Sequence, residues 1–404
     1  MTREEIYAQC VEKIAKTNAL LMELSTGVGK SKLSLDLSNY LLNSKWYEGR
    51  EEVNILILVA KRVHKQTWKD EIEKWGGIHH PTAKINIRME CYESMHKCAD
   101  KRYDIAILDE VHHVGSENRL EALKALSFGY LIGLSATIPR KLKQLFKYRY
   151  HSEIVSCDIV EAIEDEILPE PQILLFPLML DNRKATETIE LNAKEKGVIV
   201  YGEYKDLWKY KKSKQHAILR CTQKQKLIEF DKLIEWFKKQ YMMRHSEALK
   251  QSWLFQAGKR LEFLAYCKNQ IVSDILKKLD KQRTITFCKT IEQSEVLGKY
   301  CIHSQNGKAD EIYDKFNQKK INHITAVNIL NENANLVDCK YAIFANLSSS
   351  ETIQVQRTGR ALRHKSPVII IPYFQGTREQ EIVEKQLEGF SKSMIKEIHS
   401  INEI

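Results

Sequence analysis

The sequence has no long apolar run. No stretch approaches the roughly 18 apolar residues that would indicate a membrane-spanning helix. The N-terminal residues Met1 to Gln9 are charged rather than apolar, so they do not have the character of a secretory signal. We therefore expect neither secretion nor membrane insertion.

Closely spaced cysteines are also missing. The nine cysteines form no Cys-x-x-Cys pair, and the histidine doublets His79-His80 and His112-His113 have no ligand set around them. This usage indicates reduced thiols rather than a disulfide frame or a zinc site. We expect a cytoplasmic location, and the richness in lysine, isoleucine and asparagine favours a bacterial or phage-infected cell. The end at Asn402 to Ile404 shows no tail, targeting signal or nuclease motif.

Charge is unevenly distributed. The 404 residues are enough for two or three domains, and 43% hydrophobic with 29% charged residues is ordinary for a soluble chain. The net charge is +10, and residues 181–283 alone hold 24 basic and 13 acidic residues, an excess of 11. This segment is the candidate for contact with a polyanion.

The chain is organised around a glycine turn that follows an apolar strand. Asn18 to Leu24 predicts a buried strand, and the residues after Lys32 predict a leucine-rich helix. A strand-turn-helix directs backbone N–H groups and a helix N-terminus at one point, which suits phosphate. Leu24 stands where the phosphate-loop pattern usually has its first glycine, so a chance turn is the alternative. The residues expected to bind nucleotide here are Thr26, Gly27, Val28, Gly29, Lys30 and Ser31.

An acidic pair follows a second buried strand. Asp109 and Glu110 come directly after the run from Asp104 to Leu108, where parallel sheets bind ligands. Asp109 can then hold Mg²⁺ together with Ser31, and Glu110 can orient and deprotonate an attacking water. A turn or helix cap is the other interpretation. Because strands alternate with helices through the first 135 residues or so, the sequence predicts a doubly wound parallel sheet.

These segments resemble motifs I, II and III of superfamily 2 helicases, in the DExH branch with a restriction-enzyme or repair-helicase type of motor core. They are Ser25 to Ser31, Asp109 to His112 and Ser135 to Thr137. The resemblance implies ATP and Mg²⁺ as cofactors, metal contacts for Ser31, Asp109 and Glu110, and coupling roles for His112, Ser135 and Thr137. Gln9 lies near the position of an adenine-reading glutamine, although an exposed helical glutamine explains it equally well.

Other segments are similar to the nucleic-acid motifs of this family. Lys61 and Arg62 fall in a motif Ia-like run in which Ala60-Lys61 replaces the usual Pro-Thr. Tyr92 precedes the acidic strand, Lys289 stands in a motif IV-like segment and Asn328 in a motif V-like one. The resemblance implies that all five contact nucleic acid.

Gln356 to Arg363 resembles motif VI. Arg360 and Arg363 are spaced to project from one face of a helix start. The resemblance implies catalytic roles for Gln356, Arg360 and Arg363, with the two arginines as fingers on the transferring phosphoryl group. A purely structural ion-pair role is the alternative.

Residues 181–283 lie mostly outside the resemblance. Apolar residues from Leu227 to Tyr241 predict one helix, and those from Leu254 to Ile275 a second, longer one. Twelve aromatics and many lysines, with Lys209, Lys211 and Lys212 in a cluster, suit phosphate contact and base stacking. Core aromatics among solvated lysines, or a docking surface for a protein partner, are the alternatives.

The sequence thus predicts an α/β protein with two RecA-like doubly wound parallel-sheet domains and a helical insertion. We place domain 1 at 1–150, domain 2 at 151–180 and 284–404, and the insertion at 181–283. We expect a monomeric ATP-dependent helicase or translocase, with DNA favoured over RNA. An ATPase that remodels without unwinding, and a motor subunit of a restriction or defence complex, are the rivals.

Overall fold

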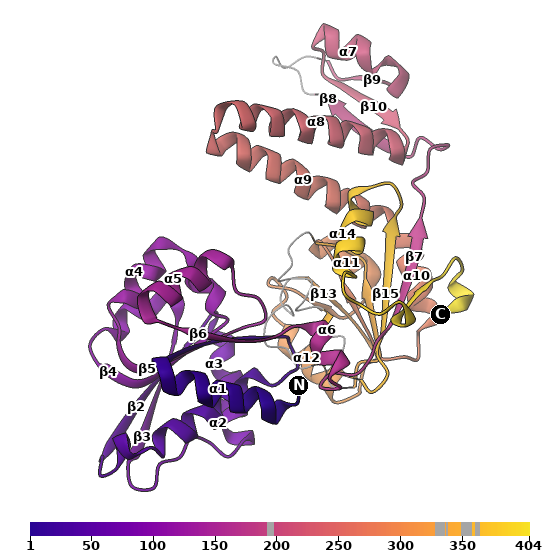
Figure 1. Ribbon diagram of the computed structural model, residues 1–404. Coiled ribbons are helices and arrows are strands. Elements are labelled where there is room, and N and C mark those ends of the chain that lie inside the picture. The colour runs from indigo at the N-terminus through magenta and orange to yellow at the C-terminus, as the bar shows by residue number, and fades with distance from the viewer. Residues whose placement is uncertain (192–197, 328–335, 337, 349–357, 360–363) are drawn as a thin grey trace. The chain divides into compact units, whose positions relative to one another are not determined.

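The computed structural model describes residues 1–191, 198–327, 336, 338–348, 358–359 and 364–404 (Figure 1). These residues divide into two compact units. The first contains residues 1–172 together with the described residues 336, 338–340, 358–359 and 364–368, and the second contains the other described residues from Ile173 onward. Each unit is built on its own parallel sheet, which confirms the two predicted doubly wound domains.

The first sheet has six strands in the order β3-β2-β4-β5-β1-β6. Adjacent strands pair in parallel throughout. The inner strands are buried on both faces, which explains their continuous aliphatic sequences. The strands are β1 (Ala19–Leu24), β2 (Glu52–Val59), β3 (Lys84–Cys91), β4 (Arg102–Asp109), β5 (Ser127–Ser135) and β6 (Glu153–Cys157).

Helices lie on both faces of this sheet, with α1, α2 and α3 on one side and α4 and α5 on the other (Figure 1). Their bounds are α1 (Arg3–Thr17), α2 (Lys30–Leu42), α3 (Arg62–Lys74), α4 (Glu117–Lys124) and α5 (Arg140–Tyr150), and the short α6 (Ile159–Glu164) follows β6. Because β1, β5 and β4 are neighbours, the loops that follow their carboxyl ends meet at one edge.

The second sheet has seven strands in the order β12-β13-β11-β14-β15-β7-β16. Its strands are β7 (Gln172–Leu178), β11 (Thr284–Phe287), β12 (Cys301–Ile302), β13 (His323–Ala326), β14 (Tyr341–Phe344), β15 (Val368–Phe374) and β16 (Ile395–Glu397). Helices α11 (Ile291–Leu297), α12 (Ala309–Asn317) and α14 (Arg378–Gln386) connect them.

The insertion is more mixed than the sequence predicts. A three-stranded sheet of β8 (Glu187–Leu191), β10 (Ala217–Cys221) and β9 (Val200–Glu203) precedes the helices, with α7 (Leu207–Ser213) between β9 and β10. Then α8 (Gln223–Arg244) and α9 (Glu247–Cys267) form a long hairpin, and α10 (Asn269–Lys278) leads into β11 (Figure 1). The prediction of one continuous helix from Leu254 to Ile275 is wrong, because the chain turns at the buried Lys268.

The boundary near residue 150 also lies later than the sequence suggests. Strand β6 pairs with β1, from Leu20 beside Glu153 to Leu24 beside Cys157, and so completes the first sheet. Among the described residues, no helix is both long and apolar enough to cross a bilayer.

Candidate functional site

The loop between β1 and α2 has the backbone of an anion-binding turn. Gly27 and Gly29 have φ values of 104° and 107°, which side-chain-bearing residues rarely adopt. A Cβ on Gly27 would also lie 2.8 Å from a Leu168 side-chain carbon. The Arg3 guanidinium donates to the Val28 carbonyl oxygen at 3.1 Å and thereby holds the loop against the start of the chain.

The N-terminus of α2 is open to a ligand. Gly29 is its N-cap, so no side chain caps the first N–H groups, and no acidic residue lies in the first turn. Such a terminus carries a partial positive charge and free donors, which suits phosphate. Lys30 Nζ donates to the Leu24 carbonyl oxygen at 2.9 Å and so lies across the same loop.

A cavity of about 620 Å³ joins this loop to the acidic pair. The lining includes all six predicted loop residues, Thr26 to Ser31, together with Asp109 and Glu110. The loop glycines and the carboxylates, some 80 positions apart in sequence, therefore meet as the sheet order requires. Further lining side chains come from α1, α2 and α3, namely Arg3, Glu4, Tyr7, Lys32, Leu33, Asp36, Thr67, Glu71, Lys74 and Trp75.

Asp109 is held in place from two sides. The Trp68 indole Nε1–H donates to its carboxylate at 3.0 Å, and the Tyr92 hydroxyl donates to its backbone carbonyl at 2.8 Å. Tyr92 is only 2% exposed. Burial, reinforced by the charges of Asp109 and Glu110, raises the pKa of Tyr92 far above its usual value, so the hydroxyl keeps its proton and remains a donor.

Glu110 belongs to a polar network that reaches the next strand. Its Oε2 lies 3.2 Å from Ser135 Oγ and 3.3 Å from His112 Nδ1, and those two atoms are 2.9 Å apart. Glu110 has a left-handed backbone, with φ 50° and ψ 56°, which costs energy for a residue other than glycine. The contacts with Ser135 and His112 hold the carboxylate in place.

Ser135 continues the network into the third predicted segment. Its Oγ lies 2.8 Å from the Thr137 carbonyl oxygen and 3.3 Å from the Thr137 backbone nitrogen. His112, Ser135 and Thr137, which the resemblance groups together, are therefore in one hydrogen-bonded chain that starts at Glu110.

The described part of the motif VI-like segment packs on the phosphate loop. A Cβ on Gly359 would lie 2.6 Å from the Thr26 carbonyl oxygen and 2.7 Å from Thr26 Cβ. Only glycine fits at position 359 without a shift of the backbone. The contact with the phosphate loop therefore explains why this position holds a glycine. Gln356, Arg360 and Arg363 lie outside the described residues, as does Asn328.

The oxygen donors on this edge fit Mg²⁺ bound together with a nucleotide. Ser31 supplies a hydroxyl and Asp109 a carboxylate to one cavity, and Mg²⁺ prefers such hard ligands, completed by water and phosphate oxygens. Within the described ranges no group of three or more histidine, cysteine, aspartate and glutamate side chains could hold a metal by itself.

The other predicted contacts are spread over the molecule. Gln9 is not part of the cavity lining, and its amide lies 3.1 Å from the Met1 sulfur, whereas Tyr7 lines the cavity. Lys61 and Arg62 are exposed at the start of α3. Tyr92 is buried, and its hydroxyl donates to the Asp109 carbonyl oxygen. Lys289 is half-buried and lines a separate cavity of about 460 Å³ in the second unit.

The predicted lysine cluster lies on α7. Lys209, Lys211 and Lys212 are exposed there beside Trp208, whose side chain is 76% exposed. Lys211 is already paired with Glu229 at 2.6 Å. The cluster therefore offers less net charge than its sequence suggests.

Sequence reasoning missed Trp68, Arg3 and Tyr7. Trp68 and the cavity-lining Trp75 are visible in the sequence as the ends of an amphipathic segment, but that pattern describes a helix and not the direction of an indole N–H. Arg3 carries no motif. A polar N–H on the buried stripe of a helix is the signal that points to Trp68, because a buried indole needs an acceptor.

Two families of known domains match the chain. Residues 2–140 match the family described as type III restriction enzyme, res subunit, and residues 267–365 match the helicase conserved C-terminal domain. The two matches fall on the two parallel sheets and include the phosphate loop, the acidic pair and the motif VI-like segment. The chain contains a superfamily 2 helicase core. The helicase core is an ATP-hydrolysing enzyme.

Relatives agree with this assignment. The DNA 3'-5' translocase XPB2 of Sulfurisphaera tokodaii is 21% identical over 405 residues, covering 95% of this chain and 84% of that protein. A Saccharomyces cerevisiae Dbp5 variant bound to RNA and ADP BeF3 has a TM-score of 0.58 at 11% identity, over 98% of this chain and 89% of that one. The Pyrococcus furiosus Hef helicase domain has a TM-score of 0.50 at 14% identity, over 95% and 97%. At these identities the structures show the fold of the helicase core.

Proposed function

We propose that the protein is a nucleic-acid-stimulated ATPase that uses hydrolysis to translocate along or unwind nucleic acid, with DNA as the favoured substrate. The observation that carries this proposal is the single cavity that contains the phosphate loop together with Asp109 and Glu110. The named relative is a DNA translocase, which favours DNA. Because one of the similar structures is bound to RNA, the test also includes RNA substrates.

Glu110 is the general base in this proposal. The Glu110 side chain is 6% exposed and its carboxylate is fixed by Ser135 and His112, so it can orient one water and accept its proton as the water attacks the terminal phosphorus. The proton moves from the attacking water to Glu110, and the bond to the leaving diphosphate breaks. Lys30 and the N-terminus of α2 stabilise the phosphate charge.

Ser31 and Asp109 would hold the Mg²⁺ that neutralises charge between the terminal phosphates. Trp68 contributes by holding the Asp109 carboxylate in one orientation. Replacement of this indole should therefore weaken metal-dependent turnover while leaving the phosphate loop unchanged.

The base of the nucleotide lies toward α1. Arg3, Glu4 and Tyr7 line that side of the cavity, while Gln9 does not. Burial raises the pKa of Tyr7, so its hydroxyl stays protonated, and it donates to the Asp36 carbonyl oxygen at 3.4 Å. Tyr7 is therefore a better candidate than Gln9 for contact with the nucleotide base.

Nucleic acid is contacted through Lys61, Arg62, Lys289, Asn328 and the basic insertion. Lysine and arginine contacts to phosphates carry little sequence information, so binding is expected to be largely independent of sequence. The network from Glu110 through Ser135 to Thr137 gives a route by which the state of the nucleotide reaches the end of β5. A two-state element at that end would turn hydrolysis into movement.

The test measures ATPase rate and strand separation with matched DNA and RNA substrates. Forked duplexes with 3′ or 5′ tails, and blunt duplexes as controls, are compared with triplex displacement, which reports translocation without unwinding. We expect Mg²⁺-dependent ATP hydrolysis that rises with nucleic acid and is greatest with DNA. Stimulation by RNA alone would reverse the substrate preference. A rate of ATP hydrolysis that no nucleic acid increases would overturn the proposal.

A further inference from the structure

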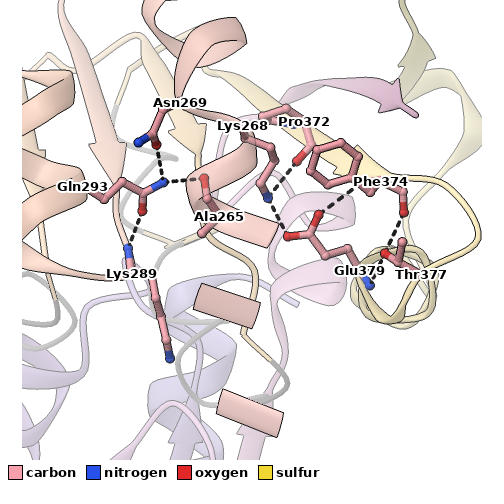
Figure 2. A network of polar contacts seen from close by, with 9 residues as sticks. All are labelled: Ala265, Lys268, Asn269, Lys289, Gln293, Pro372, Phe374, Thr377 and Glu379. Carbon is pink, nitrogen blue, oxygen red and sulfur yellow. Dashed lines mark hydrogen bonds and ion pairs between the residues drawn. The ribbon is translucent and has the colours of Figure 1, made fainter. Parts of the chain in front are cut away.

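The base of the α8–α9 hairpin is fixed by a buried ion pair. Lys268, at the turn between α9 and α10, donates to Glu379 Oε1 at 2.6 Å and to the Pro372 carbonyl oxygen at 3.2 Å (Figure 2). The side chains of Lys268 and Glu379 are 0% and 1% exposed. The second oxygen of Glu379 accepts from the Phe374 N–H at 3.1 Å, so the carboxylate is held by β15 as well. Removing either partner would leave a buried charge unpaired, which is strongly destabilising, so the ion pair ties this turn to α14 and β15.

Gln293 joins the same turn to the motif IV-like segment. Its amide nitrogen donates to the Ala265 carbonyl oxygen at 2.8 Å and to Asn269 Oδ1 at 3.0 Å. Its amide oxygen accepts from the Lys289 backbone N–H at 2.8 Å. The Gln293 side chain is buried, and both its donors and its acceptor are used. One amide therefore sets the spacing between the end of α9 and the main chain of Lys289.

This arrangement does more than cap a helix. The Thr290 hydroxyl already caps α11 by accepting from the Gln293 N–H at 3.1 Å. The Gln293 side chain instead reaches one residue further back, to Lys289, and outward to a different helix. A glutamine serving α11 alone would have no need of Ala265 and Asn269.

Lys289 is placed at the edge of an open groove. Its side chain extends away from Gln293, as Figure 2 shows, and no ion-pair partner for its ammonium occurs in the described part of the chain. The cavity that Lys289 lines also contains Tyr266 of α9, whose side chain is 62% exposed. The two other lysines of this cavity are paired with carboxylates, Lys226 with Glu187 and Lys259 with Glu262. Lys289 is therefore the lysine of this groove best able to take a phosphate.

We propose that Gln293 is a positioning residue for nucleic-acid binding: it locks the Lys289 main chain to the base of the hairpin, so that the Lys289 ammonium and the insertion engage one strand in a fixed register. This inference rests on the proposed function, because it takes Lys289 as a phosphate contact. It adds that the insertion and motif IV act as one binding unit, joined through Ala265 and Asn269.

A double-mutant cycle in the full-length protein tests it. The variants are Lys289→Ala, Gln293→Met and the double variant, with Gln270→Met as the matched control. Gln270 is an exposed glutamine on the neighbouring turn of α10, and its amide bonds only to Asp274 in the described contacts. The readouts are the dissociation constant for a mixed-sequence single-stranded DNA and the basal ATPase rate without nucleic acid.

Lys289→Ala should weaken DNA binding about fivefold, as expected for one charge-assisted contact. Gln293→Met should weaken it by a similar factor. The double variant should also lose only about fivefold rather than about 25-fold, because Gln293 acts through Lys289. Gln270→Met should bind DNA like the wild type and keep the wild-type rate of basal ATP hydrolysis.

If the double variant lost about 25-fold in DNA affinity, the two losses would have multiplied. This result would overturn the inference, since Gln293 would then act independently of Lys289. Unchanged binding in Gln293→Met, or in Lys289→Ala, would also overturn it. Should Gln293→Met fail to fold, Asn269→Ala replaces it, because this change removes one partner of Gln293 from a half-buried position and must give a smaller loss with the same non-additivity. The proposed function fails separately, if nucleic acid does not stimulate the wild-type ATPase at all.

Discussion

The nucleotide edge of the first sheet and the basic insertion of the second unit are built in opposite ways. At the nucleotide edge the important side chains are buried and hold one another, as Asp109 is held by Trp68 and Glu110 by Ser135. In the insertion many large side chains are exposed, including Trp208 and Trp236. Charges there are numerous, and several are already paired.

This difference separates two kinds of function. Chemistry needs a few atoms at fixed distances, so one substitution at the nucleotide edge removes most of the activity. Binding to a polyanion adds many weak and similar contacts, so one substitution in the insertion removes a small share. The predictions below would sharpen this comparison or break it.

The largest effect is expected at the acidic pair. Glu110→Gln keeps the shape of the side chain but cannot accept a proton, so turnover should fall on the order of 10³-fold or more while ATP still binds. Lys30→Ala should abolish turnover and also weaken ATP binding, because it removes a phosphate contact. Steady-state ATPase assays combined with nucleotide-binding titrations measure both. Wild-type turnover in either variant would break the assignment of the site.

The next effect is expected from the motif VI-like arginines. Changing Arg360 or Arg363 to Ala should lower turnover on the order of 10³-fold if each stabilises the transferring phosphoryl group. ATP affinity should fall far less. Single-turnover measurements at saturating ATP separate the two effects. A large loss of ATP binding with normal saturated turnover would make these arginines ligands of the ground state.

The insertion should respond through salt dependence. Replacing Lys209, Lys212 and Lys214 with Ala should reduce the slope of log affinity against log salt by roughly 2 to 3 units, at about 0.7 to 0.9 per phosphate contact. Adding Lys211→Ala should change the slope less than each of the others does, because Glu229 already neutralises Lys211. Basal ATPase should be unaffected. If none of the four substitutions changes the slope, α7 is a solvated face or a protein-docking surface.

A smaller effect is expected from the support of Asp109. Trp68→Phe keeps the ring but removes the 3.0 Å hydrogen bond to the carboxylate, so turnover should fall on the order of tenfold. The Mg²⁺ concentration that gives half-maximal rate should rise as well. Trp75→Phe, just past the end of α3, removes an indole hydrogen bond to Glu71 instead, so it serves as a comparison for losing an indole N–H that does not reach Asp109. Equal effects of the two substitutions would show that helix packing, rather than the carboxylate, is responsible.

The last effect concerns folding stability rather than turnover, in the sheet that carries the insertion. Burial lowers the pKa of His323 from 6.5 to about 4, and its ring lies 3.2 Å from Thr286 Oγ1. Below about pH 6.5 the unfolded chain binds a proton here that the folded chain does not, so stability should fall by up to about 1.4 kcal/mol per pH unit until about pH 4. Urea unfolding of the wild type and His323→Gln across this range measures the difference, and parallel curves would contradict it.

The nucleotide edge could be predicted from sequence because its signals are local. A strand, a glycine turn and a helix are contiguous from Asn18 to Leu42. An acidic pair that follows a strand of a parallel sheet must lie at the carboxyl edge of that sheet, where the glycine turn also lies. The roles of Tyr92 and Trp68 could not be predicted in this way. Both residues sit at helix starts or along helical stripes, and only the packed fold directs their polar atoms at Asp109.

The insertion could be predicted only in part. The α8–α9 hairpin follows from helical spacing, but the small sheet does not, because its strands are short and their pairing mixes parallel and antiparallel neighbours. The break at Lys268 has no local cause such as proline or glycine. It is set by Glu379, a residue 111 positions later in the chain, which no window of sequence around the helix contains.

That separation has a consequence for how the protein is made. Ribosomes add about 5 to 20 residues per second, so Lys268 is synthesised roughly 6 to 22 s before Glu379 exists to neutralise it. During this interval the lysine must remain hydrated, and the hairpin cannot dock firmly on strands that have not yet been translated. The docking of the insertion on the second sheet is therefore a late event of biogenesis, completed only after Glu379 has left the ribosome.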